Sequence, residues 1–247
     1  MAGHSKWKQI KHKKAITDKK RASQWTKIIR EITVAARMGG GDPSGNPRLR
    51  LAMDNARGAN MPNENIDRAI KKGTGDLEGV EYQEVAYEAY GPGGVAIYIE
   101  ALTDNVNRTV ADIRFALSKN GGNLGATGSV AWMFDHKGQI VFDAAGADEA
   151  ALLEAALEAG AADMESDEDS YVVYTDVPAF NAVQDGLRAA GLTWGDAELA
   201  MVPKSTVRVE GADAQKLVKL LDALEDLDDV QKVYTNADID EESLVEA

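Results

Sequence analysis

The sequence predicts an α+β protein: a helical N-terminal domain followed by two α/β sandwich domains, the last ferredoxin-like and inserted in the middle one. Three patterns predict this fold. Residues 17–73 show the apolar spacing of amphipathic helices, residues 84–102 alternate as strands do, and residues 139–202 follow a β-α-β-β-α-β order. A chain of 247 residues has room for about two to three compact units.

Three helices are predicted in the first part, because apolar residues recur there at the i, i+3, i+4, i+7 spacing of a buried stripe. Glycines 39–41 suit the end of the first helix, and Asn46-Pro47 suits an N-cap followed by proline at the first helical position. The predicted helices run from Thr17 or Asp18 to Met38, from Asn46-Pro47 onward, and from Met61-Pro62 to Gly73.

The second part changes to alternating strands after Gly75. Strands 84–90 and 94–102 are followed by a helix over 107–120 and by a strand with Val130, Trp132 and Phe134 facing inward. After the ferredoxin-like segment, strand 206–210, helix 212–225 and strand 229–235 are too few to form a domain alone, so they are expected to complete the sandwich begun by 84–134. The predicted domains are 1–78, 79–135 with 204–238, 136–203, and an acidic tail 239–247.

Charge is strongly segregated along the chain. The net charge is -14, but residues 1–72 hold 17 basic and 6 acidic residues, whereas residues 73–247 hold 10 basic and 35 acidic ones. A basic segment beside an acidic remainder is typical of polyanion binding. A solvated basic helix or a membrane-surface helix is the alternative. Nucleic acid is favoured because the basic residues are dispersed rather than confined to one amphipathic face.

The candidate nucleic-acid-binding residues fall into two groups. The basic arm, residues 4–14, combines lysines with rings that can stack on unpaired bases, although Trp7 could equally be a core residue. The helices that follow carry further cations, which could contact phosphates. The candidates are His4, Lys6, Trp7, Lys8, Lys11, His12, Lys13, Lys14, Lys19, Lys20, Arg21, Lys27, Arg48, Arg50, Arg57, Arg68, Lys71 and Lys72.

Catalytic and cofactor signals are weak. Cysteine is absent, which excludes disulfides and thiolate chemistry, and the histidines lack metal-ligand spacing. The glycine-rich stretch 121–128 follows a helix rather than a strand, so it does not fit a nucleotide cradle and is expected to be a tight turn or a binding loop. Asp104, Asn105 and Arg108 could serve an enzyme, but they more simply cap the 107–120 helix. We expect no catalytic residue, metal or cofactor.

A cytoplasmic protein without a membrane or small-molecule partner is the simplest expectation. The basic N-terminus lacks the apolar region of a secretory signal, and no apolar run is long enough to cross a bilayer.

Several motifs resemble those of the YebC/PmpR family. The resemblance extends from Met1 to about Asn236, with the motifs in family order. They are MAGHSKW at the start, GGGDP at 39–43, NPRLR at 46–50, NMP at 60–62, NIDRAIKKGTG at 65–75, YGPGG at 90–94, LTDN at 102–105, NRT at 107–109 and GGNLG at 121–125.

The resemblance implies a three-domain, crab-claw-shaped protein without known catalytic activity or cofactor. It leaves the bound polymer open. Bacterial relatives are described as probable transcriptional regulators that bind promoter DNA, whereas mitochondrial relatives activate translation of cytochrome c oxidase. Bacterial members have also been linked to ribosomes stalled on proline-rich stretches. We expect a regulator that binds ribosomal RNA on the ribosome, with duplex DNA at promoters as the alternative, because the basic arm suits irregular RNA and no duplex-reading element is evident.

Overall fold

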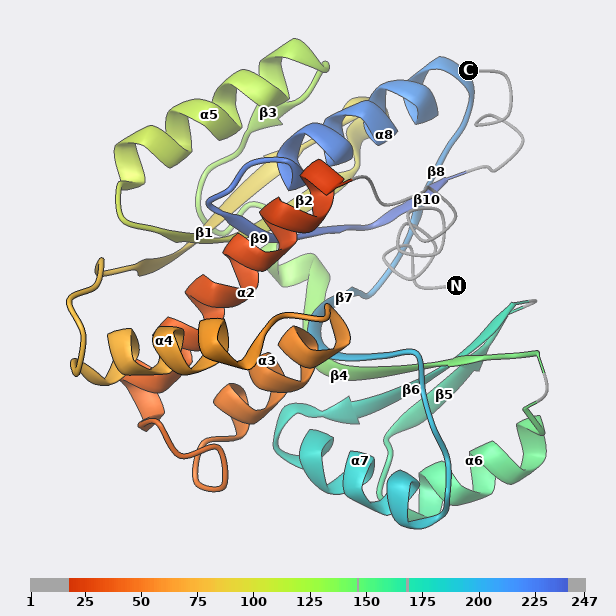
Figure 1. The fold of residues 1–247 in the computed structure, drawn as a ribbon. Helices are drawn as coiled ribbons and strands as arrows, with labels where there is room; N and C mark the ends of the chain where they lie inside the picture. Colours follow the sequence, from red (N-terminus) through yellow and green to blue (C-terminus); the bar gives the residue numbers. More distant parts are fainter. Residues whose placement is uncertain (1–17, 146, 168, 240–247) are drawn as a thin grey trace.

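The computed structural model describes residues 18–145, 147–167 and 169–239, with side chains from Ser23 onward. Three helices come first and pack around a core of their own, in which the long α2 contacts both of its neighbours (Figure 1). They span Asp18–Gly39 (α2), Pro47–Gly58 (α3) and Asn63–Thr74 (α4).

Local sequence explains how these helices begin and end. Gly40 takes the left-handed conformation after α2, with a φ of 84°, and Asn46 caps α3 by accepting a hydrogen bond from the Leu49 amide at 3.1 Å. The prediction that Gly73 closes the third helix is wrong. The helix continues to Thr74 and ends at Gly75. A Cβ on Gly73 would lie 2.4 Å from a backbone oxygen of α2, so this glycine permits close helix packing.

The first sheet has the order β3-β1-β2-β9, and two helices cover one of its faces (Figure 1). Alternate residues of its strands, such as Ala89, Ile97 and Val233, form a buried cluster with these helices. A parallel pair, β8 and β10, adjoins the same core. The elements are Gln83–Tyr90 (β1), Ala96–Thr103 (β2), Val106–Lys119 (α5), Asn123–Leu124 (β3), Val207–Val209 (β8), Gly211–Glu225 (α8), Val230–Thr235 (β9) and Ala237–Ile239 (β10), with a 3-10 turn at Pro92–Gly94 (η1).

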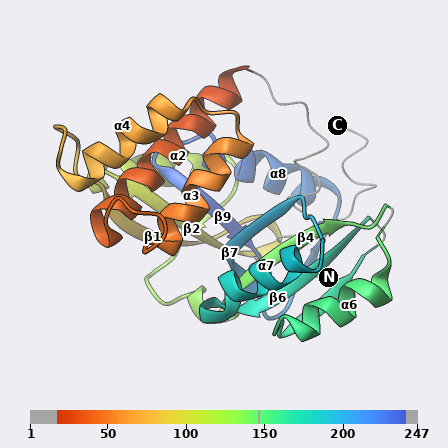
Figure 2. The same ribbon diagram turned by 60° about the horizontal axis from the view of Figure 1, so that its bottom comes forward.

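The second sheet has the order β5-β6-β4-β7, which is the strand order of a ferredoxin-like fold. Its helices α6 and α7 lie on one face and come forward in Figure 2. The chain leaves the first sheet after β3 and rejoins its core at β8 and α8, so the unit formed by β4 to β7 is inserted, and the predicted fold class is confirmed. The elements are Phe134–Asp143 (β4), Glu149–Glu158 (α6), Asp163–Ser166 (β5), Ser170–Asp176 (β6), Val177–Ala179 (η3), Phe180–Ala189 (α7) and Asp196–Pro203 (β7).

The two sheets meet through an apolar cluster that includes Tyr98 and Tyr234 of the first sheet and Phe134 of the second. Two sequence predictions are wrong, one for the segment before β4 and one for the residues at the end of β10. The predicted strand around Trp132 is the 3-10 turn Ala131–Met133 (η2), and the Trp132 side chain is exposed rather than inward. The predicted acidic tail 239–247 starts too early, because Ile239 is buried in β10; residues 240–247 lie outside the described part of the chain.

Candidate nucleic-acid interface

The structure places only part of the predicted interface. The basic arm lies outside the described residues, with its candidates His4, Lys6, Trp7, Lys8, Lys11, His12, Lys13 and Lys14. Lys19, Lys20 and Arg21 lie in the first turns of α2, and their side chains are not described. The candidates with described side chains are Lys27, Arg48, Arg50, Arg57, Arg68, Lys71 and Lys72.

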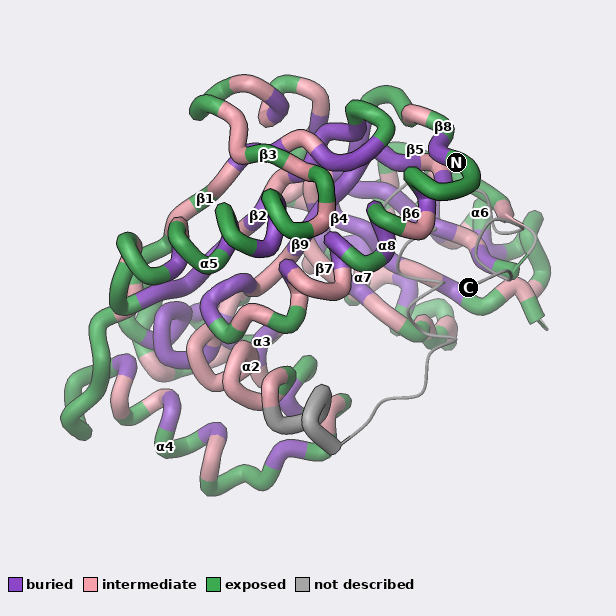
Figure 3. Tube along the Cα trace, turned by 90° about the horizontal axis from the view of Figure 1, so that it is seen from above, coloured by how far each residue is buried: buried purple, intermediate pink, exposed green. Residues whose placement is uncertain are grey.

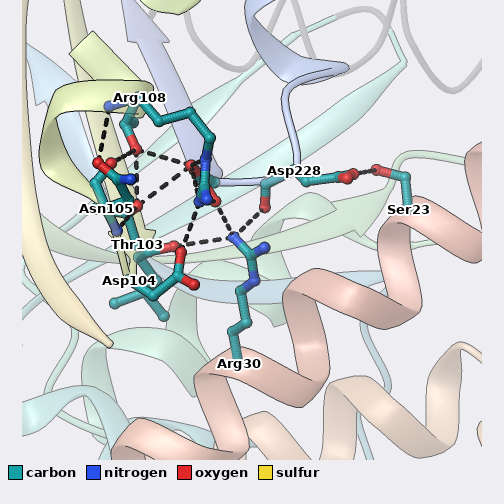
Figure 4. Close-up of polar contacts among 10 residues, drawn as sticks. Ser23, Arg30, Thr103, Asp104, Asn105, Arg108 and Asp228 are labelled. Carbon is teal, nitrogen blue, oxygen red and sulfur yellow. Dashed lines mark hydrogen bonds and ion pairs between the residues drawn. The ribbon is translucent and has the colours of Figure 1, made fainter. Parts of the chain in front are cut away.

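Cations on one face of α2 dock this helix onto the first sheet. The Lys27 ammonium donates to the backbone oxygen of Glu225 at the end of α8. Arg30, one turn further, donates to the backbone oxygens of Leu102 and Asp228 and to the Asp229 carboxylate at 2.6 Å (Figure 4). These charges therefore fix the position of α2 and face the protein rather than a ligand.

Asp229 is the centre of this docking network. Its carboxylate also accepts from Arg108 at 2.8 Å and from the Thr109 hydroxyl at 2.7 Å, while Arg108 reaches Asp104 at 2.6 Å (Figure 4). Burial alone would raise the pKa of Asp229, but the hydrogen bonds from Arg108, Thr109 and Arg30 outweigh it and hold the pKa below its usual value. The network keeps Asp229 ionised and joins α2, α5 and β9.

The N-terminus of α5 has the role predicted for it. Asn105 caps the helix by accepting a hydrogen bond from the backbone amide of Arg108 at 3.1 Å, in extended backbone geometry. Together with the ion pairs of Arg108, this gives Asp104, Asn105 and Arg108 structural roles.

Arg48 also acts within the protein. Its guanidinium pairs with Glu31 of α2 at 2.7 Å and with Glu84 of β1. Burial opposes the charge, but the bonds to the two carboxylates prevail and raise the pKa of Arg48 above its usual value. Arg48 thus links α3 to its neighbours and has little capacity left for a phosphate.

The last turns of α4 present three cations that are available to a ligand. Arg68 and Lys71 are exposed and Lys72 is half-buried, and among the described residues none of the three forms an ion pair. Their i, i+3, i+4 spacing puts them on one face. Figure 3 shows buried and exposed positions alternating along α4, with the exposed ones turned away from α2.

The remaining two cations lie on α3, beside the ferredoxin-like unit. Arg50 is exposed and forms no ion pair with any described residue, whereas Arg57 pairs with Asp54 at 2.9 Å. Both arginines line a cleft of about 450 Å³ between α3 and α7. The opposite wall of the cleft is the polar face of α7, formed by Asn181, Gln184, Asp185 and Arg188.

These α7 residues were missing from the sequence prediction. The sequence does contain a pattern that indicates them, since Asn181, Gln184 and Arg188 follow the i, i+3, i+7 spacing of one helix face. What the sequence could not supply was the position of that face opposite α3.

The glycine-rich stretch 121–128 is a structural loop held by Glu88. The Glu88 carboxylate accepts hydrogen bonds from the backbone amides of Gly128, Val130 and Ala131 at 2.5–2.8 Å. Burial would raise the pKa of Glu88, but these bonds lower it below its usual value. Within the stretch, the Gly128 amide donates to this carboxylate, and the Gly122 and Gly125 amides donate to the backbone oxygens of Leu117 and Glu88. These three amides are therefore used within the chain, and the exposed Trp132 lies just beyond the stretch.

Two further observations concern the described ranges alone, residues 18–145, 147–167 and 169–239. There, no three metal-ligating side chains of the His, Cys, Asp and Glu type come together, and no helix is long and apolar enough to cross a bilayer.

The fold defines an α+β protein with a helical N-terminal part and an inserted ferredoxin-like unit. Residues 5–76 match the family model described as the TACO1/YebC protein N-terminal domain, and residues 82–237 match the one described as the TACO1/YebC second and third domain. The chain therefore belongs to the TACO1/YebC family.

Full-length relatives and a solved structure agree with this assignment. The chain is 60% identical over its whole length to a protein of Gemmatimonas aurantiaca, covering all of both chains. It is 53% identical to one of Geobacter sulfurreducens, covering 99% and 98% of the two chains. Both are named "Probable transcriptional regulatory protein". The crystal structure of a conserved hypothetical protein from Aquifex aeolicus is similar with a TM-score of 0.86, 48% identity, and coverage of 95% and 97%.

Proposed function

We propose that the protein is a non-enzymatic, nucleic-acid-binding regulator that acts as a ribosome-associated translation factor and binds ribosomal RNA. One observation carries the proposal: the chain concentrates its positive charge in residues 1–72 and keeps Arg68, Lys71 and Lys72 of α4 free of ion pairs within the described structure. Free, clustered cations attract phosphates and supply most of the sequence-independent affinity for nucleic acid. The resemblance of its motifs to the family suggests the context in which it acts, namely ribosomes that are synthesising proline-rich stretches.

The distribution of charge on α4 favours irregular RNA over duplex DNA. A recognition helix reads the major groove with its N-terminal residues. In α4 those turns expose Glu64 and Asp67, which repel a phosphate-lined groove, and the cations lie at the opposite end. Such a helix suits backbone contacts to folded RNA, with the lysines and rings of the basic arm as a second contact.

A promoter-binding transcriptional regulator is the second candidate. It is supported by the connection between α3 and α4, whose four residues 59–62 match the length of a helix-turn-helix turn. The names of the bacterial relatives point the same way. On this alternative, the same cations would contact duplex phosphates.

Ultraviolet crosslinking in growing cells, followed by sequencing of the attached nucleic acid, tests the proposal. Ribosomal RNA mapped to one compact site is the expected result. Discrete promoter DNA with little RNA would replace the proposal by the second candidate, and recovery of neither polymer would contradict both.

A variant pair ties the crosslinks to the proposed surface. Arg68→Glu with Lys71→Glu reverses two exposed charges on α4 and should reduce the crosslinked RNA at least tenfold. The matched control is Arg114→Glu with Lys119→Glu, which reverses two exposed charges on α5. Arg48 is unsuitable for this test, because its replacement would break the pairs with Glu31 and Glu84. Equal loss in both variants would mean that overall charge, and not α4, determines binding.

A further inference from the structure

We propose that the cleft between α3 and α7 binds one or two unpaired nucleotides of a single-stranded segment, with a phosphate held between Arg50 and Arg188. This rests on the proposed function and extends it, because it gives the ferredoxin-like unit a direct part in binding. The cleft measures about 450 Å³, within the usual range for pockets that enclose a small ligand.

Charge across the cleft favours an anion. Arg50, Arg57 and Arg188 line it together with only two carboxylates, Asp54 and Asp185. The aspartates pair with arginines of their own helices, Asp54 with Arg57 at 2.9 Å and Asp185 with Arg188 at 2.8 Å, and all four side chains are at least half exposed. Exposed pairs of this kind contribute about 0–1 kcal/mol, so a phosphate can recruit these arginines at small cost. Arg50 has no pair to lose within the described structure.

Arg188 stands out in an acidic environment. Residues 134–203 contain 15 acidic residues and two basic ones, Lys137 and Arg188. Arg188 lines the cleft from α7, opposite Arg50 and Arg57 of α3. Figure 1 shows α7 next to the helical part of the molecule. Arginines facing each other across a cleft repel, and a bound phosphate removes that repulsion.

The other lining groups suit an unpaired base. Asn181 and Gln184 each offer an amide donor and acceptor, which can pair with the exposed edge of a base. Leu51 and Met53 add apolar surface. The Arg188 guanidinium lies 5.3 Å from the centre of the Trp194 ring, a cation–π contact that restrains its position. In a duplex the base edges are paired and the phosphates lie outside, so a small cleft combining both kinds of group selects a single strand.

Affinity measurements on the full chain test the role of Arg188. The probe is a fluorescently labelled 12-nucleotide single-stranded RNA, with binding followed by anisotropy at several salt concentrations. Arg188→Gln should weaken binding about five- to tenfold and reduce the slope of log K against log salt by about 0.7, the value for one phosphate contact on a single strand. Arg114→Gln, on the exposed face of α5, should leave both unchanged.

The outcomes separate the two proposals. If the chain binds the RNA but Arg188→Gln behaves like Arg114→Gln, the cleft proposal is wrong and the proposed function stands. If the unmodified chain binds neither this RNA nor any other nucleic acid, both are wrong.

A crosslinking experiment locates the nucleotide independently of affinity. Because the chain has no cysteine, Gln184→Cys introduces a single thiol into the cleft. The probe is a 12-nucleotide RNA whose central nucleotide carries a short tether ending in a mixed disulfide. Attack by the introduced thiolate should release the outer thiol of that disulfide and link the tether to the protein, at least tenfold faster in this variant than in Ser118→Cys on α5. Equal rates in the two variants would overturn the proposal.

Discussion

The two junctions formed by the first sheet differ in chemistry. The helical part is docked onto the first sheet by a charged network, with Arg30 and Arg108 around Asp229. The ferredoxin-like unit is joined to the first sheet mainly by an apolar cluster containing Phe134, Tyr98 and Tyr234, to which Lys232 of β9 adds one ion pair, with Glu198 of β7 at 3.0 Å. Apolar contact is non-directional and independent of pH, whereas the charged network depends on each partner and on ionisation.

This difference indicates what each junction does. Buried ion pairs contribute little net stability compared with apolar packing, but their directional bonds select one arrangement. The polar junction sets the orientation of α2, and hence of the cations that α3 and α4 present. The apolar junction supplies stability, because it removes large side chains such as Phe134 and Tyr234 from water.

Phe134→Ala should have the largest effect on stability, because it removes a large buried side chain from the apolar junction and leaves a cavity. The side chain is 4% exposed, and truncating a buried phenylalanine costs about 4 kcal/mol in free energy of unfolding. Urea unfolding followed by circular dichroism measures this. Phe115→Ala is the matched control, since Phe115 is 67% exposed and should change the value by less than about 0.5 kcal/mol. Similar losses for both would contradict the division into two junctions.

Asp229→Asn should have the next largest effect, about 3 kcal/mol, because it leaves Arg30 partly buried without its counter-charge. The same urea titration measures it. Asp228→Asn is the control, because the Asp228 carboxylate is exposed and Arg30 binds the backbone oxygen of Asp228 rather than its side chain. A loss below 1 kcal/mol for Asp229→Asn would show that the network does not hold α2.

Acid should separate the two junctions further. The pKa of Asp229 is lower in the folded protein than its ordinary value of 3.8, so its contribution is complete above that value and is lost as the pH falls below it. Between pH 5 and about pH 3, the free energy of unfolding should therefore fall less for Asp229→Asn than for the unmodified chain. For Phe134→Ala it should fall as much as for the unmodified chain. Parallel curves for all three proteins would contradict the assignment of this carboxylate.

Glu88→Gln should cost about 2 kcal/mol, because an amide cannot accept all three backbone hydrogen bonds that the carboxylate receives. The loss should appear locally, as faster hydrogen exchange at residues 125–131. Glu81→Gln, on an exposed carboxylate, should leave that exchange unchanged. Unchanged exchange in Glu88→Gln would mean that the loop is held by other contacts.

Most of the fold could be predicted because it follows local rules. The helix caps at Asn46 and Asn105 and the ferredoxin-like strand order are readable from residue type and period. The errors lie where tertiary contacts override the local pattern. Glycine often follows the last turn of a helix, but Gly73 lies within α4 and allows close contact with α2. The segment around Trp132 alternates like a strand, but hydrogen bonds to Glu88, 44 residues earlier, hold it as a 3-10 turn.

The candidate interface was less predictable for a related reason. A sequence identifies which residues are cationic but not which of them are neutralised by distant carboxylates. Lys27 and Arg48 have partners within the chain, while Arg68 and Lys71, of the same residue types, have none among the described residues. The distinction depends on long-range geometry.

Ser23→Ala should have the smallest effect, less than about 0.5 kcal/mol, although Ser23 belongs to the polar junction (Figure 4). Its hydroxyl lies 3.4 Å from the exposed Asp228 carboxylate, a long contact that competes with water. Urea titration beside Asp229→Asn measures the contrast. If Ser23→Ala lowered the free energy of unfolding as much as Asp229→Asn does, the junction would depend on the sum of its surface contacts. The small loss that we expect would instead show that the buried Asp229 carboxylate provides most of the stability of this junction.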